Sequence, residues 1–305
     1  MKVPSGWYAV LSAAELKPNK PLGQKRFGED LVFWRDQSDR PAVLKDLCPH
    51  RSVKLSGGEV CQNGNHIACP FHGFQFDSQG QCRHVPETGK EAPNLRVKTW
   101  QSAEKNGFIW LYVPKNEDDI GSEDSIPWFN ELQEKKFCYS EFKESWNIHY
   151  SRCIENQLDY AHLPYLHRTS IGKNFDVQGK YDFLLDESSI KVVLKSGYFH
   201  FKFPNIWYLN ISPTLKQMLA FVPVDDNTTV MYVRAYQAFV TLPLVEKLVG
   251  KVLAASNRVI LNQDKAAVIT HSPSSSLLAS DEKLYPSDRG IAWFRKQFSE
   301  KAVEV

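Results

Sequence analysis

Cys48-Pro49-His50 and Cys69-Pro70-Phe71-His72-Gly73 are two short segments that each combine one thiol with one imidazole, and eighteen residues separate them. Each segment can present a sulfur and a nitrogen from one tight loop, because proline and glycine favour turns. Strand-like runs at 42–46 and 74–76 lie beside the two loops. Two mixed pairs in such a setting predict a metal site carried by a β-rich domain.

The four side chains of these loops match the donor set of one kind of iron–sulfur centre. In a Rieske-type [2Fe–2S] cluster, two histidines replace two thiolates on one iron, so Cys48, His50, Cys69 and His72 are the predicted ligands. Zinc also accepts two cysteines and two histidines. Zinc fingers, however, normally pair a cysteine with a cysteine and a histidine with a histidine, at longer spacings than C-x-H. The C-x-H half therefore favours the cluster, and zinc stays the alternative.

Here the chain resembles the Rieske family. The high-potential respiratory members of that family carry an additional cysteine in each loop, joined by a disulfide, whereas this chain has Val53 and Phe71 there. It therefore looks like the lower-potential centres of ferredoxins and oxygenases. The four remaining cysteines are expected to be free thiols, because a disulfide framework is unusual in a long cytosolic chain. They are Cys61, Cys82, Cys138 and Cys153.

A second motif lies in the segment 156–167, which begins in the last part of a helix predicted over 146–163. Three polar side chains recur every third residue and drift only slowly around one helix face, namely Asn156, Asp159 and His162. Pro164 disfavours a continuous helix. We expect a break there to bring His167 back toward His162, so that the two imidazoles share one metal.

Two histidines and one carboxylate form the facial triad of non-haem Fe(II) oxygenases. The N-x-x-D-x-x-H-x₄-H pattern resembles the iron motif of the Rieske non-haem iron oxygenases, and this resemblance spans nearly the whole chain. It implies a third ligand on a long helix near the C-terminus, where Asp264 in Asn262-Gln263-Asp264-Lys265 matches best. Asp281 and Glu282 are weaker alternatives, and an exposed surface role is the ordinary alternative for Asp264.

The resemblance also implies roles for the two other polar residues of the second motif. Asp159 would hydrogen-bond His72 of a neighbouring subunit and a ligand such as His162, and would pass electrons around a head-to-tail homotrimer. Asn156 would lie close to the iron. The alternative for both is an ordinary place on a helix face.

Length and composition agree with a two-domain protein. The 305 residues are 42% hydrophobic with a net charge of +2, which argues against a nucleic-acid binder. We expect an all-β Rieske domain at 1–116 and an α+β catalytic domain at 117–305, the latter helix-grip-like by resemblance. The acidic stretch 114–127 would be the linker.

The chain is expected to act in the cytoplasm without a membrane partner. No signal peptide is recognisable at the N-terminus. The apolar stretch 242–261 is interrupted by charged residues, so it predicts an amphipathic helix instead of a bilayer span. These charged residues are Glu246, Lys247, Lys251 and Arg258.

The resemblance implies a Rieske oxygenase that uses O₂ and a mononuclear Fe(II). Electrons would come from an external NAD(P)H-dependent reductase or ferredoxin, since the sequence has no Gly-rich nucleotide fingerprint. The chain is short for ring-dihydroxylating subunits, so we expect monooxygenation, as hydroxylation or oxidative demethylation of a small organic substrate. Cis-dihydroxylation is the alternative, and a Rieske electron carrier or a non-catalytic binding protein would be further possibilities.

Overall fold

The computed structural model describes residues 1–133, 137–195 and 197–305. Contacts divide the chain into two compact units, Gly6–Ile126 and a second made of Met1–Ser5 with Pro127–Val305. The functional division expected between residues 116 and 117 stays a prediction. Each unit is described by itself below.

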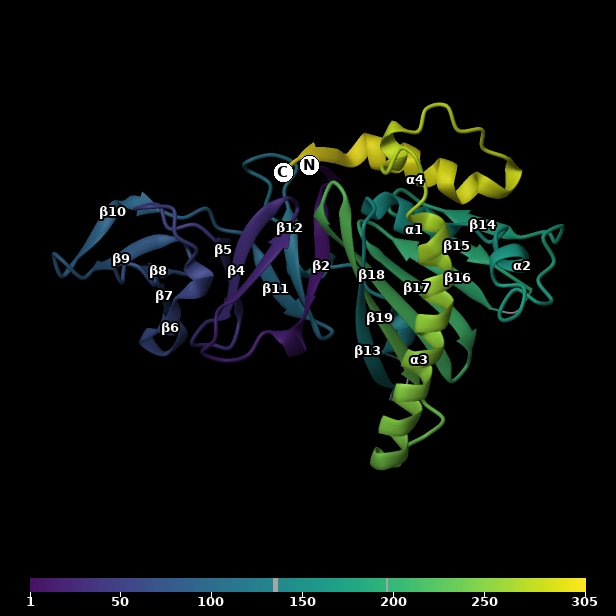
Figure 1. The fold of residues 1–305 in the computed structure, drawn as a ribbon, viewed down its shortest axis with the longest axis horizontal. Helices are drawn as coiled ribbons and strands as arrows, with labels where there is room; N and C mark the ends of the chain where they lie inside the picture. Colours follow the sequence, from purple (N-terminus) through teal and green to yellow (C-terminus); the bar gives the residue numbers. More distant parts are fainter. Residues whose placement is uncertain (134–136, 196) are drawn as a thin grey trace. The chain divides into compact units, whose positions relative to one another are not determined.

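The 6–126 unit consists of antiparallel strands in three sheets (Figure 1). The first sheet has the order β11 (Ser102–Lys105), β12 (Phe108–Val113), β2 (Gly6–Ser12), and the second has β3 (Leu22–Arg26), β4 (Glu29–Arg35), β5 (Pro41–Lys45). The third has β10 (Lys90–Arg96), β9 (Gln81–Val85), β8 (Gln75–Asp77), β7 (His66–Ala68), β6 (Glu59–Cys61). The prediction of an all-β first domain is confirmed.

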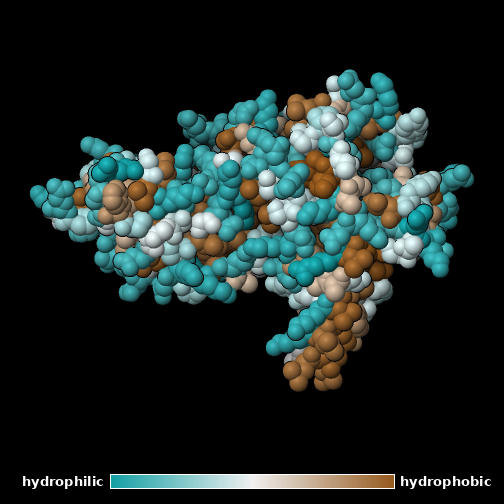
Figure 2. Space-filling model, viewed as in Figure 1, coloured by the Kyte–Doolittle hydropathy of each residue, from teal (hydrophilic) through white to brown (hydrophobic). Residues whose placement is uncertain are grey.

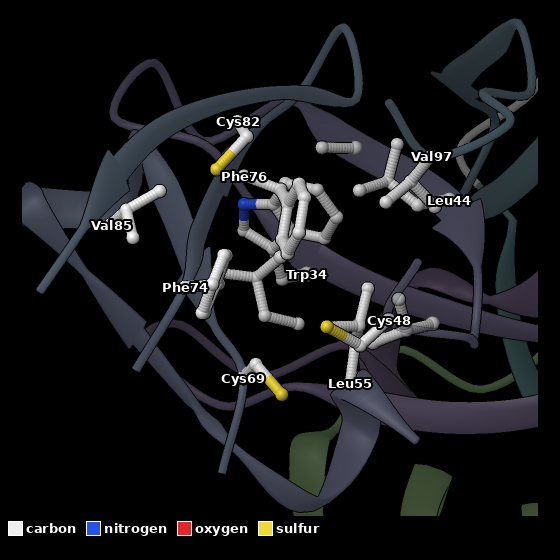
Figure 3. Close-up of a cluster of buried hydrophobic side chains, with 13 residues drawn as sticks. Trp34, Leu44, Cys48, Leu55, Cys69, Phe74, Phe76, Cys82, Val85 and Val97 are labelled. Atoms are coloured by element: carbon white, nitrogen blue, oxygen red, sulfur yellow. The ribbon is translucent and has the colours of Figure 1, made fainter. Parts of the chain in front are cut away.

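A buried cluster fills the part of this unit that carries the two Cys/His loops. Trp34 and Phe76 are fully buried there, and the thiols of Cys48 and Cys69 belong to the same cluster (Figure 3). The Trp34 indole N–H donates to the Gly64 carbonyl at 3.0 Å, so the ring lies in one fixed place. The cysteine positions are therefore set by a packed core, where even one methylene is felt.

The second unit is built on one antiparallel sheet of seven strands with helices against it (Figure 1). The sheet order is β13 (Cys138–Trp146), β19 (Thr228–Gln237), β18 (Leu215–Asp225), β17 (Ile206–Ser212), β16 (Tyr198–Lys202), β15 (Ser189–Val193), β14 (Asp182–Leu185). The helices are α1 (Tyr150–Leu158), α2 (Leu163–Leu166), α3 (Pro243–Val268) and α4 (Arg289–Lys301), and β1 (Lys2–Pro4) pairs with β20 (Ala302–Glu304). The α+β prediction is confirmed.

Alternation along the strands decides which sheet face receives the helices. Phe201 of β16 packs against Phe294 of α4 at 5.7 Å between ring centroids. On the same face, β13 contacts α3. Arg258 of α3 lies over the ring of Phe142 in β13 and donates a hydrogen bond to the carboxylate of Glu144 in β13. The opposite face holds Tyr208, against which Phe129 stacks.

The helix predicted over 146–163 is wrong at both ends. Trp146 is the last residue of β13, where it pairs with Thr229, and α1 covers only Tyr150–Leu158. Asp159 ends this helix in an extended conformation, with φ −84° and ψ 119°. The break therefore comes before Pro164, which lies in the first turn of α2, where a missing N–H costs nothing.

The predicted helix from residue 243 is confirmed as α3. Among the described residues, no helix combines the length and the apolar character that crossing a bilayer requires.

His149 begins α1 and gives the fold a pH dependence. Its Nδ1 accepts from the backbone N–H of Ser151, and its side chain is 2% exposed. Burial lowers the pKa of His149 to about 4. The folded state then binds fewer protons than the unfolded chain between pH 6.5 and 4, so stability is lost as the pH falls through this window.

We expect the free energy of unfolding to fall by about 3 kcal/mol from this residue between pH 6.5 and 4. His149→Asn keeps a side chain suited to capping but does not titrate. Urea denaturation at pH 7 and pH 4.5 checks this. Between these two pH values, the free energy of unfolding should fall less in His149→Asn than in the wild type. An equal fall in both proteins would show that His149 is not the cause of the pH dependence.

Candidate metal centres

The two Cys/His loops have the same backbone hydrogen-bond pattern. In the first loop the Cys48 N–H donates to Val53 O at 2.8 Å, and the Ser52 N–H donates back to Cys48 O at 2.9 Å. In the second loop Cys69 and Phe74 form the corresponding bond at 2.8 Å, and Gly73 donates back to Cys69 O at 3.0 Å. The fourth residue after each cysteine has a positive φ, 55° at Ser52 and 71° at Gly73. The sequence half-motifs thus fold into two similar turns.

These loops divide their donors between the interior and the surface. Cys48 and Cys69 are buried, whereas His50 and His72 are exposed, with their ring centroids 4.8 Å apart. Burial raises the pKa of the Cys48 thiol to about 11, so a bound cation is what would hold it as a thiolate. Two buried sulfurs and two neighbouring imidazoles fit a [2Fe–2S] centre with its histidine-bound iron at the surface.

A second group of potential ligands lies between α2 and α3. His162 precedes α2 and His167 follows it, so this short helix holds the two imidazoles at its two ends. Asp264 comes from the C-terminal part of α3. One potential ligand atom from each of these three residues lies within 4.8 Å of the others. The structure therefore brings together the two histidines and the carboxylate that the sequence suggests.

The three side chains already make close polar contacts. Asp264 Oδ1 lies 2.9 Å from His167 Nε2 and 3.5 Å from His162 Nε2. His167 and Asp264 are only 1% and 3% exposed. A buried carboxylate between two imidazoles, all offering one atom to the same small space, is the donor set expected for non-haem iron.

The electrostatics of the group favour a bound cation. Burial disfavours the charged form of His162, but hydrogen bonds to Asp159 and Asp264 outweigh it and raise its pKa to about 9. Burial likewise opposes ionisation of Asp264, yet the two histidines lower its pKa. The carboxylates thus stabilise positive charge at the position where the three potential ligands converge.

Asp159 lies beside this group, and Asn156 lies near Asp159. Asp159 Oδ2 is 3.3 Å from His162 Nδ1, and Oδ1 accepts from the Ala161 N–H at 2.7 Å. Asn156 and Asp159 both line a cavity of about 300 Å³. The Asn156 Nδ2 is buried and has no hydrogen-bond partner among the described residues.

One rival for the third ligand position has other partners. Glu282 accepts from Arg152 at 2.7 Å and from Arg295 at 2.6 Å, and both arginines also bond Glu155. The hydrogen bond from Arg152 has the largest effect on the pKa of Glu282. Together with the bond from Arg295 and the charges of both arginines it outweighs burial and lowers this pKa to about 2. This ion-pair network lines the same cavity as Asp159.

Comparison with known proteins adds two independent findings. Residues 6–101 match the family model described as the Rieske [2Fe-2S] domain. The QL mutant of NdmA from Pseudomonas putida CBB5, solved with theobromine, superposes with a TM-score of 0.79 at 25% identity, over 95% of this chain and 88% of that one. The chain therefore contains a Rieske [2Fe–2S] domain, and over nearly its whole length it is similar to the Rieske non-haem iron oxygenases. The Rieske [2Fe–2S] domain and the two-histidine, one-carboxylate site are the two metal centres of this chain.

Other proteins similar to this chain share its fold or part of its sequence. Dicamba monooxygenase bound to dicamba superposes with a TM-score of 0.80 at 18% identity, over 96% of each chain, which shows the fold. Chlorophyllide a oxygenase of Chlamydomonas reinhardtii is 31% identical over 171 residues, 56% of this chain and 25% of that protein. The oxygenase component of 3-ketosteroid-9-alpha-monooxygenase of Rhodococcus rhodochrous is 30% identical over 169 residues, which are 53% of this chain and 42% of that protein. The matched region thus spans less than half of these curated relatives.

Gln263 is a candidate site residue that the sequence did not reveal. Its Oε1 lies 2.8 Å from His167 Nδ1, and accepts a hydrogen bond from the protonated Nδ1. That bond leaves Nε2 of His167 free to bind a metal. The sequence carries no sign of this contact, because 96 residues separate the two side chains.

We expect Gln263→Leu to weaken iron binding at the mononuclear site about 10- to 100-fold, because the orientation of His167 is lost. Competition with a chelator, followed by iron analysis, measures this. Gln263→Glu keeps an acceptor and should bind iron nearly normally, and Asn262→Leu is the control on the exposed neighbouring position. Unchanged affinity in Gln263→Leu would contradict the role.

Proposed function

We propose that this chain is a monooxygenase that hydroxylates or oxidatively demethylates a small organic substrate. It would use O₂ and electrons from an external NAD(P)H-dependent reductase or ferredoxin. The observation that carries the proposal is the convergence of His162, His167 and Asp264 at a buried point in a chain that also has a Rieske domain. An electron carrier needs no such second site.

The side chains have distinct proposed tasks. Cys48 and Cys69 are buried and would hold the cluster on its core side, and the exposed His50 and His72 would hold it on the side open to electron-transfer partners. The bound metals supply electron storage and O₂ activation. The proposed ligands His162, His167 and Asp264 hold the iron with positions left open.

Asp159 is the proposed connection between the two centres. Its carboxylate is within 3.3 Å of His162 Nδ1 and is partly exposed, so it can also accept a hydrogen bond from outside the catalytic unit. We propose that this bond comes from His72 of a neighbouring chain in a homotrimer, and Asn156 stays a proposed neighbour of the iron.

Mixing two inactive variants tests the transfer between chains. Cys69→Ser lacks the cluster, and Asp264→Asn lacks the mononuclear iron. If electrons pass between subunits, oligomers reassembled from both chains should recover part of the activity that neither variant has alone. A mixture that stays inactive, although mass measurement shows mixed oligomers of folded chains, would refute the proposed path.

Monooxygenation is supported by the names of two similar proteins, dicamba monooxygenase and 3-ketosteroid-9-alpha-monooxygenase. The decisive experiment is a substrate screen for coupled consumption of O₂ and NAD(P)H with a surrogate reductase, followed by product analysis in ¹⁸O₂. One labelled oxygen in the product, or loss of a methyl group as an aldehyde, is expected. A cis-diol with two labelled oxygens would instead establish dihydroxylation. A cytoplasmic location stays a prediction, and several curated relatives are chloroplastic.

A further inference from the structure

The N-terminal half of α3 carries an exposed apolar surface. Five side chains form one row along the helix, which we call the α3 stripe: Leu244, Leu248, Val252, Ala255 and Val259. Their spacing of four, four, three and four residues keeps them on one face. Leu244 is 84% exposed and Leu248 63%. Figure 2 shows this part of α3 as a projecting apolar rod.

The opposite side of the helix already has its partner in the fold. A Cβ at Gly250 would lie 3.1 Å from the Ser140 Cβ of β13, so the helix and the strand are in close contact there. Farther along, the Lys265 ammonium donates to Ser145 O at 2.8 Å. The sequence predicts an amphipathic helix, and the face that contacts β13 is its buried face. The α3 stripe is a second apolar face, which none of the described residues covers.

The exposed charges beside the α3 stripe have one sign. Lys247 and Lys251 are exposed, one helix turn apart, and neither forms an ion pair with a described residue. Glu246 is the only acidic residue between positions 242 and 259, and it is half-buried next to the Cys138 thiol. Two more apolar side chains just before the helix, Phe239 and Leu242, are also exposed.

We propose that the α3 stripe docks on the surface of an anionic lipid bilayer. A helix with an apolar row and lysines along its border is suited to lie in the interface, with leucines below the headgroups and ammonium groups among them. A symmetric contact with the same helix of a second copy is less suitable, because it would bring lysines of like charge together. A contact with a different face of a neighbouring copy is an outcome that the experiment distinguishes. This inference is independent of the proposed reaction, and it revises the expectation that the chain has no membrane partner.

The experiment measures binding of the metal-loaded full chain to vesicles by flotation. Vesicles of neutral phosphatidylcholine are compared with vesicles that contain phosphatidylglycerol. Lys247→Gln/Lys251→Gln should bind the anionic vesicles about 25-fold more weakly, since each basic residue contributes about 1 kcal/mol at such a surface. Leu244→Ser/Leu248→Ser should lose at least about tenfold on both kinds of vesicle. Leu184→Ser is the matched control, because Leu184 of β14 is 58% exposed outside the stripe.

Circular dichroism and iron content establish that each variant is folded and loaded. The proposal is overturned if the wild-type chain does not float with anionic vesicles, or if the serine double variant binds as well as the wild type. It is also overturned if no vesicle is bound and the serine double variant has a smaller mass in sedimentation. That last result would assign the α3 stripe to contact between copies of the chain.

Discussion

Asp264→Asn is expected to leave the cluster intact and to remove the mononuclear iron. The iron content should fall from about three to about two atoms per chain, because a neutral amide cannot replace the only carboxylate among the three proposed ligands. Product formation should fall at least about 1,000-fold, since a catalytic metal supplies several kcal/mol. Iron analysis, together with the visible spectrum of the cluster, separates the two centres.

The control for this variant is Asp281→Asn. Asp281 is exposed in the loop after α3 and was an alternative third ligand in the sequence. It should retain all its iron and its activity. If Asp264→Asn kept about three iron atoms, or if Asp281→Asn lost one, the proposed ligand set would be wrong. Wild-type protein that holds only cluster iron after full loading would reduce the proposal to an electron carrier.

Asp159→Asn is expected to keep both metal centres but to slow the passage of electrons between them about 10- to 100-fold. The amide has nearly the shape of the carboxylate, so the bond from the Ala161 N–H can persist. The negative charge beside His162 Nδ1 is lost, and with it the acceptor proposed for His72. The rate at which O₂ and substrate reoxidise a chemically reduced cluster measures the effect in a single turnover.

Iron analysis decides how a slow Asp159→Asn variant is interpreted. Full iron content with slow reoxidation supports the proposed connection, whereas iron loss would mean that Asp159 acts mainly by holding His162. Asp182→Asn, on exposed β14, is the control for charge loss in the same unit. An unchanged reoxidation rate in Asp159→Asn would contradict the proposal.

The cluster motif and the class of each domain could be predicted from the sequence, because they depend on short-range chemistry. Each cluster loop places a cysteine and a histidine within four residues, so the local turn alone brings the two donors together. A continuous apolar run likewise predicts the buried strand Phe108–Val113, and helical periodicity predicts α3. Family resemblance, and not spacing, pointed from His162 and His167 to Asp264.

The length of the helix before the iron motif could not be predicted well from periodicity. The pattern suggested a helix from Trp146 to Leu163 that breaks at Pro164. In the structure Trp146 belongs to β13, and α1 ends at Leu158. The pairing of Trp146 with Thr229, a residue 83 positions away, is a tertiary contact that outweighs helical propensity.

The sequence by itself therefore determined the kind of metal chemistry and the two kinds of domain, because both depend on residues that are close together in the chain. Only the tertiary structure decided that Gln263 meets His167 and that Asp264 lies between two imidazoles almost a hundred residues away. It also decided that one apolar face of α3 packs on the sheet while the α3 stripe remains exposed. The physical reason is that periodicity identifies an apolar face, whereas the packing of distant segments determines what, if anything, covers it.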